Sequence, residues 1–166
     1  VSYGVRDTVN REIINKSIKI IHNGSPNGMV IKDFTDTKHD KEKIRYELGI
    51  SNDDFVYGFV GRIVGDKGIN ELVEAFNELN KSNNSIKLVL VGSYELHLDP
   101  LKQATMNIIQ SNPNIIETGF QKDVKKYLSI MNVFVSPSYR EGFGLSLLEA
   151  NLMGIPVIAT NITGYN

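Results

Sequence analysis

The sequence contains no cysteine and no tryptophan among its 166 residues. Without cysteine there is no disulfide framework, no thiolate-ligated zinc and no thiol nucleophile. No apolar run approaches the roughly 20 residues that a membrane-spanning helix requires. The net charge is only −1, from 18 Lys and Arg against 19 Asp and Glu. Bulk charge therefore gives no reason to expect nucleic acid or an anionic membrane as a partner.

The apolar residues that are present make up 41% of the chain, which is enough for the core of one domain. They alternate between short runs rich in Val, Ile and Phe and stretches with the period of a helix. The short runs, predicted as buried parallel strands, are 18–21, 55–60, 86–91, 114–118, 133–135 and 155–159. The predicted helices are 40–48, 69–79, 100–111, 124–131 and 145–152. This alternation predicts an α/β domain with a doubly wound parallel sheet and helices on both faces.

Two cationic residues stand in one glycine-rich segment, 61–68, which reads GRIVGDKG and follows a predicted strand. Ligands of doubly wound sheets bind beyond the carboxyl ends of the strands, so this segment is a candidate site. Arg62 can grip a phosphate with parallel hydrogen bonds, and Lys67 can add a point charge. Together they could neutralise a leaving diphosphate without a metal. The alternative is two solvated charges on a loop, and spacing alone does not choose between them.

Glu141 and Glu149 form a second group, because one precedes and the other lies within the predicted helix 145–152. Glu149 lies at the edge of the apolar face of that helix, where an unpaired carboxylate is costly. Either a structural ion pair or a ligand must compensate this cost. Two neighbouring ribose hydroxyls are suitable ligands for one carboxylate.

Other familiar sites are poorly supported. The sequence has no G-x-x-x-x-G-K-[ST] phosphate loop, and Leu147 stands where a third glycine would complete a dinucleotide fingerprint after Gly142 and Gly144. A nicotinamide oxidoreductase is therefore disfavoured, although two glycines before a helix can still present N–H groups to a phosphate. The segment with Glu95, His97 and Asp99 is a weak metal candidate and is better explained as a solvated loop.

Residues 137–150, which read PSYREGFGLSLLEA, resemble the E-x7-E signature of retaining glycosyltransferases of family 4. Residues 154–160, GIPVIAT, and the segment GRIVGDKG fit the same family. The likeness runs in order through nearly the whole chain. It favours the ligand-binding interpretation of the charged residues over the structural one.

This resemblance implies one half of a GT-B fold, which pairs two Rossmann-like domains across a cleft. The chain corresponds to the C-terminal, donor-binding domain. Residues 1–17 are then expected to be a linker or hinge from an N-terminal domain. Residues 18–166 are expected to be the Rossmann-like donor nucleotide-sugar-binding domain, truncated at its C-terminal end.

The same resemblance implies roles for individual residues. Arg62 and Lys67 are expected to contact the donor diphosphate and, with Glu141 near the donor sugar, to take part in catalysis. Glu149 is expected to hold the ribose hydroxyls. The further expected donor contacts are Gly61, Gly119, Phe120, Gly142, Phe143, Gly144 and Leu145, with Gly119 and Phe120 bordering the base. No metal ligands are expected.

The implied reaction is sugar transfer, with retention of configuration, from a nucleotide diphosphate sugar to a saccharide or lipid-linked acceptor. A UDP-sugar is the favoured donor, a hexosyltransferase the favoured enzyme type, and no cofactor or essential metal is expected. The acceptor is expected to bind through the N-terminal domain, so this chain alone is expected to be inactive. Residues 23–28, NGSPNG, resemble a loop of bacterial enzymes that build surface polysaccharides. A cytoplasmic location is expected, with peripheral contact at the inner face of the membrane left open for the full-length enzyme.

Two other functions remain open at this point. One is a sugar-nucleotide epimerase, which uses a similar GT-B cleft. The other is a non-catalytic nucleotide-binding module, against which the retention of Arg62, Lys67, Glu141 and Glu149 counts. The base, the sugar, the acceptor, the linkage and the oligomeric state are not determined by the sequence.

Overall fold

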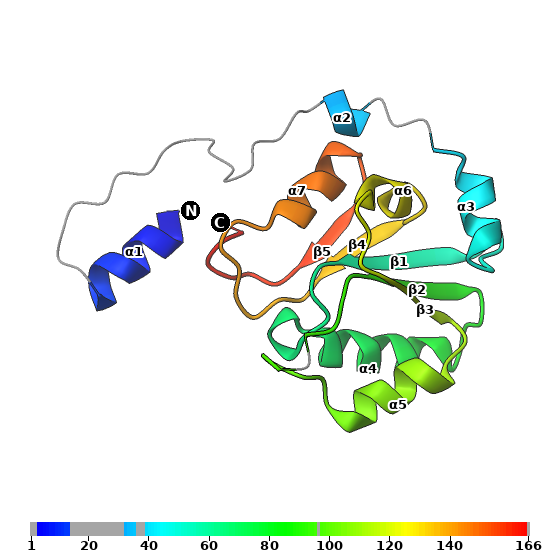
Figure 1. Cartoon of the computed structure of the whole chain (residues 1–166), viewed down its shortest axis with the longest axis horizontal. Helices are drawn as coiled ribbons and strands as arrows, with labels where there is room; N and C mark the ends of the chain where they lie inside the picture. Colours follow the sequence, from blue (N-terminus) through cyan, green and yellow to red (C-terminus); the bar gives the residue numbers. More distant parts are fainter. Residues whose placement is uncertain (1–2, 14–31, 36–38, 96, 166) are drawn as a thin grey trace.

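A computed structural model describes residues 3–13, 32–35, 39–95 and 97–165 of the chain (Figure 1). Its helices are α1 (Tyr3–Glu12), α2 (Lys32–Thr35), α3 (Lys41–Glu47), the 3-10 turn η1 (Gly65–Lys67), α4 (Ile69–Asn80), α5 (Gln103–Ser111), α6 (Val124–Leu128) and α7 (Leu145–Leu152). Its strands are β1 (Phe55–Val60), β2 (Ile86–Val91), β3 (Ile115–Gly119), β4 (Val133–Ser136) and β5 (Val157–Ala159). The predicted strand 18–21, the loop 22–28 and the predicted boundary at residues 17 and 18 lie outside the described residues.

The five strands form one parallel sheet in the order β3-β2-β1-β4-β5. The chain builds outward from β1 to β2 and β3, then returns to place β4 on the other side of β1. This reversal creates a switch point between β1 and β4, where the loops leaving the two strands diverge. In open α/β sheets, ligands bind at this point, beyond the carboxyl ends of the strands. The predicted doubly wound α/β fold is confirmed.

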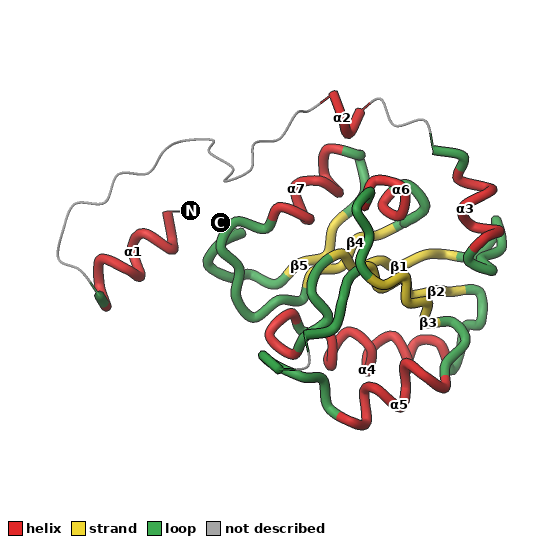
Figure 2. Tube along the Cα trace, viewed as in Figure 1, coloured by secondary structure: helices red, strands yellow, loops and turns green. Residues whose placement is uncertain are grey.

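Helices cover both faces of the sheet, with α4 and α5 on one face and α6 and α7 on the other (Figure 2). Residues of β1 contribute to a hydrophobic core on each face of the sheet. Phe59 packs with Ile69 and Val73 of α4 on one face. Val56 and Val60 belong to the core on the other face. Because both faces are buried, the strands need apolar residues at successive positions. This explains why the central strands β1 and β2 are nearly continuous apolar runs.

The predicted elements match the structure closely, with differences at their ends. The helix expected from Pro100 begins only at Gln103, because the backbone N–H of Lys102 is held by the side chain of Asn70 at 3.0 Å in an extended conformation. Strand β5 begins at Val157 and not at Ile155, whose N–H bonds to the carbonyl of Ala150 at the end of α7. Among the described helices, none is long and apolar enough to cross a bilayer.

Candidate functional site

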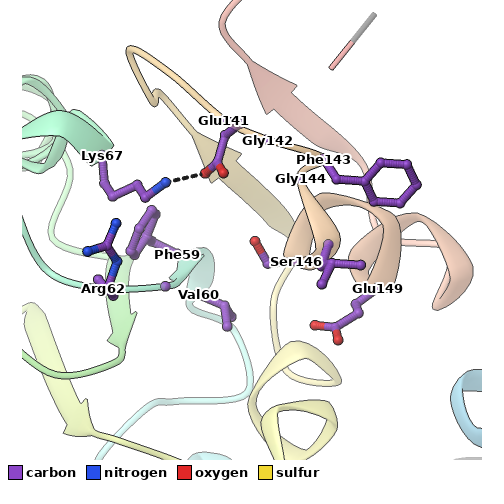
Figure 3. A pocket seen from close by; sticks show the side chains of 12 residues that line it. Phe59, Val60, Arg62, Lys67, Glu141, Gly142, Phe143, Gly144, Ser146 and Glu149 are labelled. Carbon is purple, nitrogen blue, oxygen red and sulfur yellow. Dashed lines mark hydrogen bonds and ion pairs between the residues drawn. The ribbon is translucent and has the colours of Figure 1, made fainter. Parts of the chain in front are cut away.

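A cavity of about 490 Å³ opens at the switch point between β1 and β4 (Figure 3). It is bounded by the end of β1, the segment that follows it, and the loop that leads into α7. The residues that line it are Phe59, Val60, Gly61, Arg62, Lys67, Glu141, Gly142, Phe143, Gly144, Leu145, Ser146 and Glu149. Every residue predicted from the sequence as a donor contact is therefore gathered here except Gly119 and Phe120.

Gly119 and Phe120 lie at the end of β3, two strands away from β1. Phe120 is 77% exposed. Neither residue lines the cavity, and their expected contact with a base stays a prediction. Conversely, Phe59, Val60 and Ser146 line the cavity but were not predicted from the sequence. Their position at the end of a strand and at the start of a helix was the only available signal.

Arg62 is placed by a continuation of the sheet beyond β1. The N–H of Gly61 donates to the carbonyl of Val91 at 3.0 Å, and the N–H of Ile63 donates to the carbonyl of Ser93 at 2.9 Å. Ile63 also forms an isolated parallel bridge with Tyr94. The segment leaving β1 therefore runs beside the segment leaving β2, and the backbone around Arg62 is held on both sides.

Lys67 closes the short turn η1, which the segment after β2 holds in place. The carboxylate of Asp99 accepts a hydrogen bond from the N–H of Asp66 at 2.5 Å, and the Asp99 carbonyl accepts one from the N–H of Gly65 at 3.0 Å. From the other side, the N–H of Tyr139 donates to the carbonyl of Asp66 at 2.9 Å. Asp99 thus supports the turn that carries Lys67, a role that the sequence analysis missed because the two segments are far apart in the chain.

Replacing Asp99 with alanine is expected to lower the free energy of unfolding by about 1–2 kcal/mol, because it leaves the Asp66 N–H without its carboxylate acceptor. D99N is expected to lose clearly less, since the amide oxygen can accept the same hydrogen bond. Urea unfolding of the two variants measures the difference. Equal losses for D99A and D99N would show that this hydrogen bond does not hold the turn.

The Lys67 ammonium forms an ion pair with Glu141 at 2.7 Å, and Ser138 donates to the same carboxylate oxygen at 3.1 Å. The Lys67 and Glu141 side chains are only 12% and 20% exposed. Arg62 forms a second ion pair, with Glu95 at 2.9 Å, in which the side chains are 48% and 35% exposed. The hydrogen bond to Glu95 raises the pKa of Arg62, with Asp66 and Glu141 adding to the effect. Both cations of the cavity therefore face a carboxylate.

The first residues of α7 line the cavity, and the first N–H groups of a helix have no partner within it. Gly144 precedes this helix in the left-handed conformation, with φ of 66°. A Cβ atom at Gly144 would lie 2.4 Å from the ring of Tyr165, which also hydrogen-bonds to Ser136 through its hydroxyl. Glycine is therefore needed here for both backbone conformation and space, and a helix N-terminus that lines the cavity suits an anion.

Glu149 lies on α7 on the opposite side of the cavity from Arg62 and Lys67 (Figure 3). It is half-buried, and burial raises the pKa of its carboxyl, opposed only by the positive charge of Lys125. Within the part of the chain that the structure describes, no hydrogen bond or ion pair to this carboxylate is found. The structural ion pair considered as an alternative is thus not observed, which leaves the carboxylate available to a ligand.

The weak metal candidate of the sequence is accounted for by other contacts. Glu95 pairs with Arg62, and Asp99 accepts from the backbone of η1. No group of three or more His, Asp or Glu side chains converges on a common point within residues 3–13, 32–35, 39–95 and 97–165.

Comparison with known proteins assigns the chain to a family. The family model described as "Glycosyl transferases group 1" matches residues 40–166. The capsular polysaccharide biosynthesis glycosyltransferase CapM of Staphylococcus aureus is 37% identical over 147 residues, covering 89% of this chain and 38% of that protein. An Escherichia coli UDP-Gal:alpha-D-GlcNAc-diphosphoundecaprenol alpha-1,3-galactosyltransferase is 34% identical over 147 residues, covering 85% of this chain and 37% of that protein.

Solved structures agree with the sequence comparisons. Anabaena Alr3699/HepE in complex with UDP-glucose superposes with a TM-score of 0.68 at 26% identity, covering 83% of this chain and 38% of that one. This chain thus spans about two fifths of the length of the relatives it matches. Its Rossmann-like sheet matches one domain of GT-B glycosyltransferases. On the match over residues 40–166, the chain belongs to the group 1 glycosyltransferase family.

Proposed function

We propose that this chain is the donor-binding domain of a retaining glycosyltransferase of family 4 that takes its sugar, a hexose, from a UDP-sugar. The observation that carries the proposal is the composition of one cavity. Two cations stand on one side of it, and the N-terminus of α7 stands on the other with Glu149, a carboxylate that has no hydrogen-bond or ion-pair partner among the described residues (Figure 3). A nucleotide diphosphate sugar carries groups that match these side chains. Its diphosphate, which suits the cations, lies between the sugar and a ribose whose hydroxyls suit a carboxylate.

In the proposed complex, the diphosphate lies between the cations Arg62 and Lys67 and the N-terminus of α7. Arg62 binds it through its planar fork and Lys67 as a point charge. Glu149 accepts hydrogen bonds from the two ribose hydroxyls. Glu141 and the backbone of 142–145, which line the same cavity, border the sugar in this arrangement.

The proposed chemistry breaks the bond between the anomeric carbon and the diphosphate oxygen and forms a bond from that carbon to the acceptor oxygen on the same face. Negative charge grows on the leaving diphosphate, where preorganised positive groups stabilise it most. The leaving phosphate oxygen takes the proton of the acceptor hydroxyl. Arg62 and Lys67 supply the neutralising charge in this scheme, which assigns no step to a metal ion.

The acceptor side of the reaction belongs, in this proposal, to a domain outside the chain. The relatives include enzymes of capsular polysaccharide and lipid-linked oligosaccharide synthesis, which supports a saccharide or lipid-linked acceptor in bacterial surface polysaccharide synthesis. The complexes of HepE with UDP and UDP-glucose support a UDP-sugar donor. We propose that the full-length enzyme is cytoplasmic and acts at the inner face of the membrane. The isolated chain is expected to bind the donor and to transfer no sugar.

Glu149→Gln is the variant that tests the ribose assignment. We expect it to weaken UDP binding at least several-fold, because an amide accepts less strongly than a carboxylate from two hydroxyls. We also expect its melting temperature to be equal or higher, since burial without a partner disfavours the charged carboxylate of the folded protein. Ligand-observed NMR titration with UDP and a thermal melt give the two values.

The sign of the stability effect follows from the raised pKa of Glu149. A carboxyl whose folded pKa is raised binds its proton more readily in the folded state, so it costs stability once pH rises above the unfolded value. The neutral glutamine removes that cost. A lower melting temperature with unchanged UDP affinity would assign Glu149 a structural role and contradict its proposed part in donor binding.

A further inference from the structure

We propose that Glu95 sets the affinity of the site for diphosphates by competing, as a built-in anion, for the guanidinium of Arg62. The inference rests on the proposed function, and it adds a residue that the sequence did not connect with donor binding. Glu95 does not line the donor cavity, whereas Arg62 does. The carboxylate therefore acts on the donor through Arg62.

The backbone geometry places the two residues together. The segments leaving β1 and β2 stay in parallel contact beyond the sheet, through the N–H of Ile63 and the carbonyl of Ser93 and through the bridge between Ile63 and Tyr94. Arg62 and Glu95 flank this contact, one on each segment. Their ion pair, with Nη1 and Oε2 2.9 Å apart, spans two held segments.

A second contact holds the segment that carries Glu95. The hydroxyl of Tyr94 hydrogen-bonds to the carboxylate of Glu117 on β3. This contact attaches the segment after β2 to the neighbouring strand on its far side. Glu95 is therefore presented to Arg62 from a segment supported on both sides.

Each of the two cations of the cavity is already paired with a carboxylate before any ligand arrives. Lys67 is paired with Glu141, and Arg62 is paired with Glu95. A diphosphate that enters must share or take over these cations and must also lie near two carboxylates. Only one hydrogen bond joins Arg62 to Glu95, so the other donors of the guanidinium fork remain able to reach a phosphate.

Glu95 and Glu141 differ in what their removal would do. Glu141 is enclosed, also accepts from Ser138 and borders the proposed sugar position, so its replacement would disturb several contacts. Glu95 is more exposed and lies outside the cavity. Its replacement by glutamine removes one negative charge near the diphosphate and leaves the lining of the cavity unchanged. Glu95 therefore moderates diphosphate affinity, which favours release of the nucleotide diphosphate product.

The test is an NMR titration of the chain with UDP and, separately, with inorganic pyrophosphate, which carries no base or ribose. We expect E95Q to tighten binding of both probes about three- to five-fold, the upper part of the range of an exposed ion pair. The gain should shrink as salt is raised from 50 mM to about 0.5 M, because exposed charges are screened. E74Q is the matched control, since it removes a carboxylate from an exposed position of α4 and should leave both affinities unchanged.

A double variant assigns the effect to Arg62. In the R62A background, E95Q should have no more effect than E74Q, because the group for which Glu95 competes is gone. Weaker binding by E95Q, or the same gain with and without Arg62, would overturn the proposal. Wild-type chain that binds neither UDP nor pyrophosphate would instead contradict the proposed donor site itself, so the two failures are distinguishable.

Discussion

Replacing Lys67 with methionine is expected to weaken UDP binding by about 30-fold or more, because removing one member of a buried charge pair typically weakens binding by this much. The variant removes the more enclosed of the two cations in the donor cavity, whose side chain is only 12% exposed. It also leaves Glu141 partly buried without its cation, beside the position proposed for the diphosphate. Lost attraction and added repulsion therefore act in the same direction. Isothermal titration calorimetry or NMR titration with UDP measures the change.

The control for this prediction is K81M. Lys81 pairs with Glu78 on the exposed surface of α4, and its side chain is 65% exposed. Its removal changes the net charge by the same amount without touching the cavity, and should leave UDP affinity unchanged. If K67M bound UDP as tightly as K81M does, Lys67 would have no part in holding the diphosphate.

Replacing Gly92 with alanine is expected to lower the free energy of unfolding by about 3 kcal/mol or more, through overpacking and backbone strain together. A Cβ atom at this position would lie 1.8 Å from the carbonyl oxygen of Gly61, and the backbone has a φ of 152°. The added Cβ and the carbonyl oxygen are both attached to backbone, so neither can move away without shifting the chain. The carbonyl also belongs to the residue that precedes Arg62. Urea unfolding followed by circular dichroism measures the loss.

Gly119 provides the matched comparison for Gly92. It has a φ of 67°, but a Cβ atom there would meet nothing within 4 Å. G119A should therefore show only the cost of the left-handed backbone, roughly 1–2 kcal/mol. Equal losses in G92A and G119A would mean that close contact between the segments leaving β1 and β2 does not constrain the fold. A larger loss in G92A locates that constraint next to the proposed diphosphate site.

Much of the fold was predictable because strands that are buried on both faces of a sheet have apolar residues at successive positions of the sequence. The run 55–60 coincides with β1 and the run 86–91 with β2, since central strands of a covered parallel sheet need apolar residues throughout. The ends of elements were less predictable. The start of α5 depends on a hydrogen bond from Lys102 to Asn70, more than thirty residues earlier in the chain, and no local pattern encodes such a contact.

The candidate site divides in the same way. Arg62, Lys67, Glu141 and Glu149 were selected from their residue types and their positions after strands and at a helix start, and they line one cavity. The partners of these residues were not selected. Asp99 supports the turn of Lys67, and Glu95 pairs with Arg62, yet in sequence both stood in a segment explained as a solvated loop. Their contacts exist only because parallel strands bring their carboxyl ends to one edge.

The sequence by itself determined the architecture, since apolar runs and helix periods dictate which elements form and which faces they bury. It also determined the chemical types available at the strand ends. Only the tertiary structure decided which charges meet, because pairing across the switch point depends on strand order and on close packing at Gly92 and Gly144. It likewise decided that Glu149 stands without a partner among the described residues, a question that spacing left open. An ion pair is a contact between segments distant in the chain, and local pattern carries information only about near neighbours.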